Sequence, residues 1–163
     1  MILGLSLGAF TLFHVIISLL GIASGLLVTI RMIGGYRLGG TNEIFLVTTI
    51  ATSLTGFLFP FKTFGPAHIV GVISLVVLAV ALVARYVRYL DGPWRMIYVI
   101  SAVTALYLNV FVGVVQAFGK IGFLHKFAPT GSEPPFAVAQ ALVLLLFLAL
   151  GFYAVKGFHP GRA

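Results

Sequence analysis

The sequence predicts an all-α membrane protein, a polytopic helix bundle of five transmembrane helices formed by a single domain over residues 1–163. Hydrophobic residues make up 61% of the chain and charged residues only 8%, whereas an average soluble domain has about 25% charged residues. So few charges cannot cover a water-soluble fold of this size. The apolar residues also form long runs, and a helix needs about 20 such residues to cross the hydrocarbon core.

Short breaks rich in glycine and proline separate the five predicted helices. The predicted spans are 3–30, 44–61, 66–84, 94–118 and 136–155. Four glycines surround Tyr36 and Arg37 in the first break, and the third break is the turn Asp91-Gly92-Pro93. Pro66 and Pro134 open the third and fifth helices, where proline suits the first turn because its missing N–H has no helical partner there.

Small and polar residues share one face of the first predicted helix. His14, Ser18, Gly21 and Gly25 recur at steps of four, three and four residues, which places them on the same side of a helix. Gly21 and Gly25 form a GxxxG pair, and such a pair permits the close approach of another helix or of a cofactor.

The basic residues predict the orientation, because Lys and Arg near helix ends are retained on the cytoplasmic side. With five crossings, one side carries Arg31, Arg37, Arg85, Arg88, Arg95, Lys156 and Arg162. The other side carries Lys62, Lys120 and Lys126. We therefore expect the N-terminus outside and the C-terminus in the cytoplasm. Because these residues are spread between apolar runs, we expect the lipid bilayer as the partner and no nucleic acid.

Five polar residues on four helices are expected at a similar depth near the outer face. They are His14, His68, Asn109, Gln116 and Gln140. His14 lies seventeen residues before Arg31. His68 lies seventeen residues before Arg85, so both are expected roughly 25 Å above the inner boundary at a rise of about 1.5 Å per residue. Polar groups in hydrocarbon are costly and tend to mark function, although each of these residues alone also fits a hydrogen bond between helices.

The sequence carries no catalytic motif. It has no cysteine, which excludes thiolate catalysis and disulfides. Its three acids, Glu43, Asp91 and Glu133, fall in loops or at helix ends. We therefore expect no enzymatic activity from the chain on its own. The leading interpretation is a non-enzymatic accessory or structural subunit of a membrane complex, with other membrane subunits or further copies of the chain as partners.

The polar layer supports an alternative, a redox protein that binds b-type haem, a metal or a quinone. His14 and His68 would ligate or bind the group, since imidazole is a common axial ligand. The side chains of Asn109, Gln116 and Gln140 would hydrogen-bond its polar edge or orient its ligands. This alternative requires the first and third predicted helices to face each other.

Two other regions offer candidates for function. His125 stands between hydrophobic residues in segment 119–135, which we expect to lie along the membrane interface above the polar layer, and it is a third candidate metal ligand with His14 and His68. The hydroxyl side chains of the second predicted helix indicate another alternative, a small-molecule carrier or channel. They belong to Thr48, Thr49, Thr52, Ser53 and Thr55.

Two fragments of the chain carry a resemblance. They are Phe64-Gly65-Pro66-Ala67-His68-Ile69-Val70-Gly71 and Pro129-Thr130-Gly131-Ser132-Glu133-Pro134-Pro135-Phe136. Both resemble small multi-helix inner-membrane proteins of bacteria, a group without an assigned activity. The resemblance implies a multi-pass protein of the bacterial inner membrane and carries over no functional residues. The chain is also similar, in architecture only, to the membrane domains of b-type cytochromes, because those domains too place histidines of different helices beside small residues.

Overall fold

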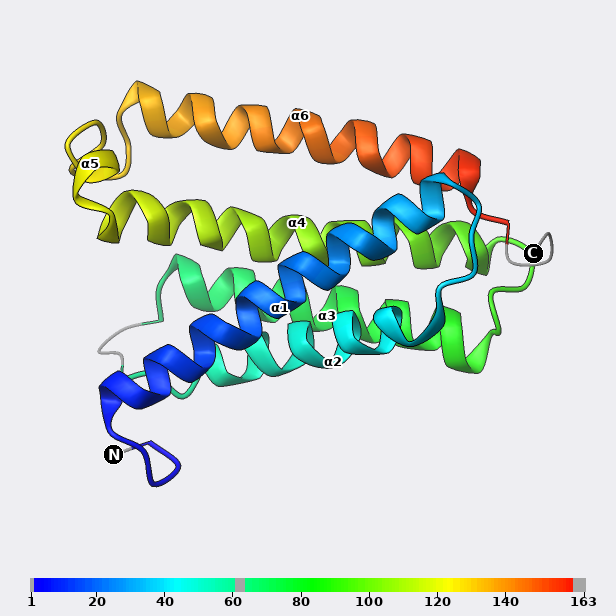
Figure 1. Ribbon diagram of the computed structural model, residues 1–163, viewed down its shortest axis with the longest axis horizontal. Coiled ribbons are helices and arrows are strands. Elements are labelled where there is room, and N and C mark those ends of the chain that lie inside the picture. The colour runs from blue at the N-terminus through cyan, green and yellow to red at the C-terminus, as the bar shows by residue number, and fades with distance from the viewer. Residues whose placement is uncertain (1, 61–63, 160–163) are drawn as a thin grey trace.

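Long helices make up most of the computed structural model, which describes residues 2–60 and 64–159 (Figure 1). The helices are α1 (Leu7–Ile33), α2 (Gly39–Gly56), α3 (Pro66–Leu82), α4 (Trp94–Lys120), α5 (Gly122–His125) and α6 (Pro134–Gly157). A π-helical turn, Val83–Val87, continues α3. The predicted all-α class is confirmed. Phe61, Lys62 and Arg162, which entered the predicted spans and orientation, lie outside the described residues.

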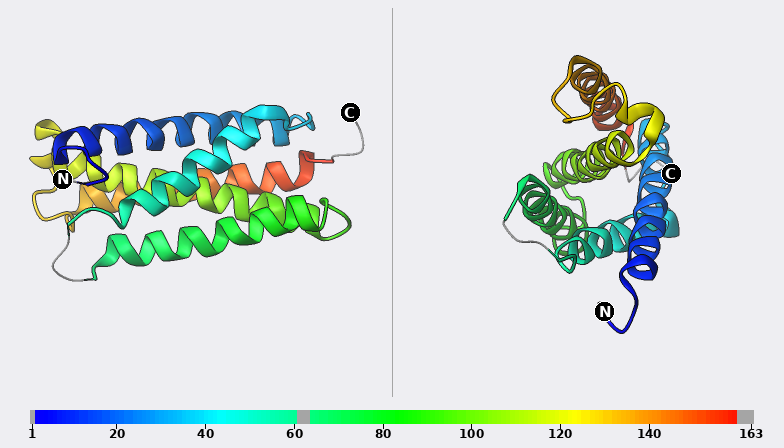
Figure 2. Two further views of the ribbon diagram at one scale, coloured as in Figure 1. Left: turned by 90° about the horizontal axis from the view of Figure 1, so that it is seen from below. Right: turned by 90° about the vertical axis from the view of Figure 1, so that its left-hand side faces the viewer.

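The helices α1, α2, α3 and α4 form a ring, which Figure 2 shows end-on in its right-hand view. α2 lies between α1 and α3, α4 packs against α1 and α3, and α6 packs on α4 and α1 from outside the ring. Within the described residues, α1 and α3 make no contact with each other. We call the end of the bundle that carries Arg31, Arg85 and Arg95 the arginine end, and the end with His14 and His68 the histidine end.

The predicted start of the first helix is four residues too early. Leu3 and Gly4 have φ angles of 51° and 80°, which a helix does not permit. Ser6 instead caps the helix, since its hydroxyl accepts a hydrogen bond of 3.2 Å from the Ala9 N–H. An N-cap serine satisfies one of the backbone donors that the first helical turn leaves unpaired.

The second predicted helix is displaced along the chain, because α2 begins at Gly39 and ends at Gly56 instead of running from 44 to 61. Its early start makes Asn42 part of the helix and buries it completely. Its early end fits Pro60, since a proline disfavours helical backbone in the residue before it.

Among the described residues, four helices are long and apolar enough to cross a membrane. They are Leu7–Ile33, Pro66–Val87, Trp94–Lys120 and Pro134–Gly157. α2 is not one of them, because Asn42, Glu43 and its hydroxyl side chains lower its hydropathy. The chain is thus a helix bundle with four helices capable of spanning a membrane, and the fifth crossing remains a prediction.

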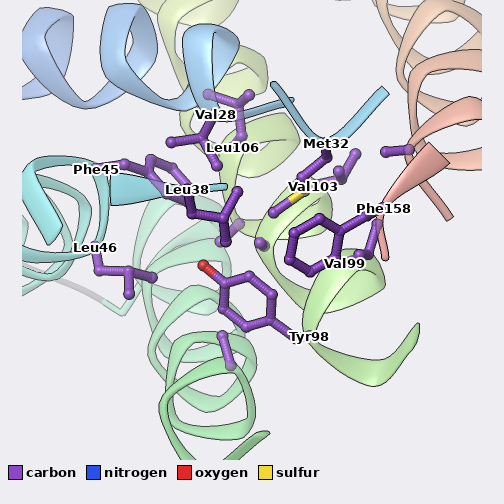
Figure 3. Packing of buried hydrophobic residues seen from close by; sticks show 14 of the residues in the cluster. Val28, Met32, Leu38, Phe45, Leu46, Tyr98, Val99, Val103, Leu106 and Phe158 are labelled. Atoms are coloured by element: carbon purple, nitrogen blue, oxygen red, sulfur yellow. The ribbon is translucent and has the colours of Figure 1, made fainter. Parts of the chain in front are cut away.

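The best-packed part of the bundle lies at the arginine end. Side chains from α1, α2, α4 and the residue after α6 meet there (Figure 3). Its largest fully buried members include Met32, Phe45, Tyr98, Leu106 and Phe158. By contrast, residues 7–20 of α1 and 107–120 of α4 carry one buried residue between them, Phe10. The helices are therefore tightly packed at the arginine end and loosely packed at the histidine end.

The contact between the ends of α1 and α6 supplies a test of this packing. A Cβ atom added to Gly157 would lie 2.2 Å from the Ile33 carbonyl oxygen and 2.7 Å from that of Met32. These backbone atoms cannot rotate away as a side chain can. We expect Gly157→Ala to lower the free energy of unfolding by about 1–3 kcal/mol, the usual cost of overpacking. Circular dichroism during an SDS titration of the detergent-solubilised protein measures it.

Gly151→Ala is the matched control on the same helix. Its added Cβ would lie 3.6 Å from Val103 Cγ1, an ordinary van der Waals contact. Because alanine favours a helix over glycine by up to about 1 kcal/mol, Gly151→Ala should leave stability unchanged or raise it. Equal losses at both positions would contradict the observed packing of α6 on α1.

Candidate functional site

His14 on α1 is half-buried and pairs with the C-terminal turn of α2. Its Nδ1 lies 2.8 Å from Thr55 Oγ1, and its ring meets the Phe59 ring edge-on with centroids 5.1 Å apart. The Thr55 hydroxyl donates its single proton to the Ala51 carbonyl at 2.7 Å. When the Thr55 hydroxyl makes this bond, Nδ1 of His14 is the donor to Thr55, and the lone pair of the neutral imidazole is on Nε2.

His68 lies in the first turn of α3 and caps its own helix. Its Nδ1 accepts a hydrogen bond of 3.2 Å from the Gly65 N–H. A neutral imidazole that accepts at Nδ1 carries its proton on Nε2. The ring stacks on Phe64, with centroids 5.1 Å apart, and it also meets Phe57 at 5.9 Å. His68, which we expected to be a ligand, thus uses the lone pair of Nδ1 to cap its own helix.

The two histidines lie at the same end of the bundle but do not face each other. α2 lies between the helices that carry them, and each imidazole packs on a different phenylalanine, His14 on Phe59 and His68 on Phe57. Axial ligation of one haem needs a lone pair from each imidazole directed at the same iron. In His68, the lone pair of Nδ1 accepts the hydrogen bond from the Gly65 N–H. The geometry therefore does not support a bis-histidine haem site.

Of the three amide residues expected in the polar layer, two link helices. Asn109 Nδ2 donates to the Ser18 carbonyl of α1 at 3.4 Å, and Gln140 Nε2 donates to the Phe111 carbonyl of α4 at 3.1 Å. Gln116 is exposed on α4. The structure thus brings Asn109 within one helical turn of His14, because Ser18 Oγ in turn donates to the His14 carbonyl at 2.7 Å.

His125 lies in the short helix α5, beyond the histidine end of α4, and its side chain is exposed. Residues 2–60 and 64–159 hold no group of three or more His, Cys, Asp or Glu side chains that could bind a metal ion together. His14, His68 and His125 are accordingly not assembled into one metal centre in the described structure.

A polar network that the sequence did not predict lies at the arginine end. The Tyr98 hydroxyl donates a hydrogen bond to Asn42 Oδ1, and both side chains are fully buried. Beside this pair, Arg85 binds Glu43 with a distance of 2.8 Å between Nη2 and Oε1. A signal for Asn42 was present, because Asn42, Phe45, Leu46 and Thr49 recur at helical spacing and all are buried.

No protein-family model, no curated protein and no solved structure matches this chain. The contacts described above connect α1 to α2, α1 to α4, α2 to α4, α2 to the π-helical turn after α3, and α4 to α6. In an apolar environment, polar side chains form hydrogen bonds of this kind between neighbouring helices.

The pairing of Thr55 with His14 can be tested against its neighbour Thr52. Thr55→Val removes the acceptor of His14 Nδ1, so the free energy of unfolding should fall by about 1 kcal/mol, the usual worth of one hydrogen bond. Nitrogen NMR of the imidazole should show the proton on Nδ1 in the wild type, with a changed signal in the variant. An SDS titration followed by circular dichroism measures the stability.

Thr52→Val is the matched control one turn away. Thr52 Oγ1 is buried and makes no hydrogen bond within the described structure. Removing an unpaired buried hydroxyl should leave stability unchanged or increase it. If Thr52→Val cost as much as Thr55→Val, the assigned role of Thr55 would be wrong.

Proposed function

We propose that the chain is a multi-pass protein of the bacterial inner membrane that crosses it five times, with the N-terminus outside and the C-terminus in the cytoplasm. Two observations support this proposal. α2 runs beside α1 in the opposite direction along most of the bundle (Figure 1). Arg31, Arg85, Arg88 and Arg95 lie together at one end of the bundle, as retention of arginine on the cytoplasmic side requires.

We further propose that the protein acts as a non-enzymatic accessory or structural subunit of a membrane complex. The observation that carries this proposal is the use of the polar side chains. His14, Asn109, Gln140 and Arg85 each bind another element of the same bundle. A side chain engaged in this way holds helices in place and is not presented to a substrate. The quinone-binding and carrier interpretations remain predictions.

The topology can be mapped directly, because the chain has no cysteine and each introduced thiol is therefore the only one. With five crossings, Leu58→Cys and Ser132→Cys should react with a membrane-impermeant maleimide in intact spheroplasts. Tyr36→Cys and Asp91→Cys should react only after permeabilisation. Mass spectrometry of the purified protein reads the labelling.

Tyr36 and Leu58 together decide the number of crossings, since they flank the helix whose crossing is in question. If Tyr36→Cys and Leu58→Cys both reacted in intact spheroplasts while Asp91→Cys was protected, α2 would not cross the membrane. Reaction of Tyr36→Cys and Asp91→Cys alone would reverse the proposed orientation.

The subunit role predicts a stoichiometric assembly. After extraction from native membranes in a mild detergent, native mass spectrometry should find the 17.4 kDa chain in a complex of defined mass with another membrane protein or with further copies of itself. The double variant His14→Ala and His68→Ala should assemble to the same mass. A monomer with a Soret absorption band that the double variant loses would overturn the proposal in favour of a haem protein.

A further inference from the structure

A groove runs between α3 and α4 on the outside of the bundle. Its wider part, with a volume of about 500 Å³, is lined by Val76, Ala79, Val80, Val83, Trp94 and Ile97. It continues along α4 past Ile100 to Thr104 as a hollow of about 270 Å³. From Trp94 to Thr104 it extends for about 15 Å at the helical rise of about 1.5 Å per residue. Its walls are almost entirely aliphatic and open to the surroundings of the helices.

A positive charge lies at the arginine end of this groove. The Arg88 guanidinium lies over the ring of Trp94, 4.8 Å from its centroid, and Trp94 itself lines the groove. Within residues 2–60 and 64–159, Arg88 makes no ion pair, and its side chain is exposed. The aliphatic groove therefore ends at an indole and an uncompensated cation.

Arg88 directly follows the π-helical turn. On a regular α-helix, residues three apart lie on nearly the same face. Here Arg85 lies within the π-helical turn and binds Glu43 of α2, whereas Arg88, just after that turn, lies over Trp94 of α4. Irregular turns of this kind occur often at functional sites. The two arginines thus have different partners, and only Arg88 lies at the end of the groove.

We propose that this groove binds one anionic phospholipid, with an acyl chain against Val76, Val80 and Ile97 and the phosphate at Arg88 beside Trp94. The charge at the mouth argues for this occupant, since an aliphatic wall alone would accept any lipid. Basic pockets between membrane helices bind anionic headgroups, and tryptophan is favoured at the headgroup level. The inference rests on the proposed membrane insertion but not on the proposed subunit role.

Trp94 is the only tryptophan of the chain, so its fluorescence reports on the groove. The purified full-length protein is reconstituted into two sets of phosphatidylcholine vesicles. One set contains a small fraction of brominated phosphatidylglycerol, and the other contains the same fraction of brominated phosphatidylcholine. Bromine quenches a tryptophan that it touches. We expect brominated phosphatidylglycerol to occupy the site about fivefold more favourably than brominated phosphatidylcholine, the effect of about one basic residue at the surface.

Three variants separate a site from general lipid contact. Arg88→Gln should abolish the preference for phosphatidylglycerol. Val80→Phe should reduce quenching by filling the groove, and it is tolerable because Val80 is partly exposed. Lys156→Gln is the matched control, since Lys156 also lies over an aromatic ring at the arginine end, 4.3 Å from the centroid of Phe152, but beside no lining residue of this groove. The preference should survive there.

Equal quenching by the two lipids in the wild type would overturn the proposal, because the contact would then be nonselective. A preference lost equally in Arg88→Gln and Lys156→Gln would also overturn it, since the charge of the whole end would be responsible. Absence of quenching by both lipids would show that protein covers the groove. Labelling of Leu58→Cys and Asp91→Cys in vesicles prepared in the same way distinguishes these outcomes from a failure of membrane insertion.

Discussion

Where α1 crosses α2 and α4, side chains of both neighbouring helices pack so closely on Gly25 that position 25 has no room for a side chain. A Cβ atom there would lie 2.6 Å from Leu106 Cδ1 and 2.8 Å from the ring of Phe45. One turn earlier, a Cβ on Gly21 would lie 3.1 Å from the amide nitrogen of Asn109. Asn109 reaches the Ser18 carbonyl only because the helices approach this closely. The crossing therefore fixes both the apolar core of the arginine end and the start of the polar layer.

Beyond this crossing, the polar groups follow a simple energetic rule. A hydrogen bond contributes about 1 kcal/mol net, whereas a buried group left unpaired costs about 1–3 kcal/mol. His14, Tyr98 and Arg85 obtain partners on other elements, so each stabilises one particular arrangement of helices. Asn42 Nδ2 remains without a partner within the described structure. The free-energy cost of burying this unpaired group is offset by the hydrogen bond that Asn42 Oδ1 accepts from Tyr98 and by the close packing around Asn42.

The features that depend on residue spacing along one helix could be predicted from the sequence. Hydrophobic runs and their glycine and proline breaks located α3, α4 and α6 to within two residues at their starts. Spacing cannot give the order of helices around the bundle, which depends on packing between distant segments. That order puts α2 between the two histidines. The polar start of α2 resembled a loop, because the burial of Asn42 depends on Tyr98, 56 positions later.

Arginines gather at one end of the bundle, but their contacts differ. Arg95 donates from Nη1 to the Val155 and Phe158 carbonyls at 2.8 and 2.5 Å, which satisfies acceptors that the end of α6 leaves unpaired. Arg85 neutralises Glu43. Arg88 has an aromatic face and no counter-ion within the described residues. The first two charges are used inside the bundle, whereas the charge of Arg88 is directed at the surroundings.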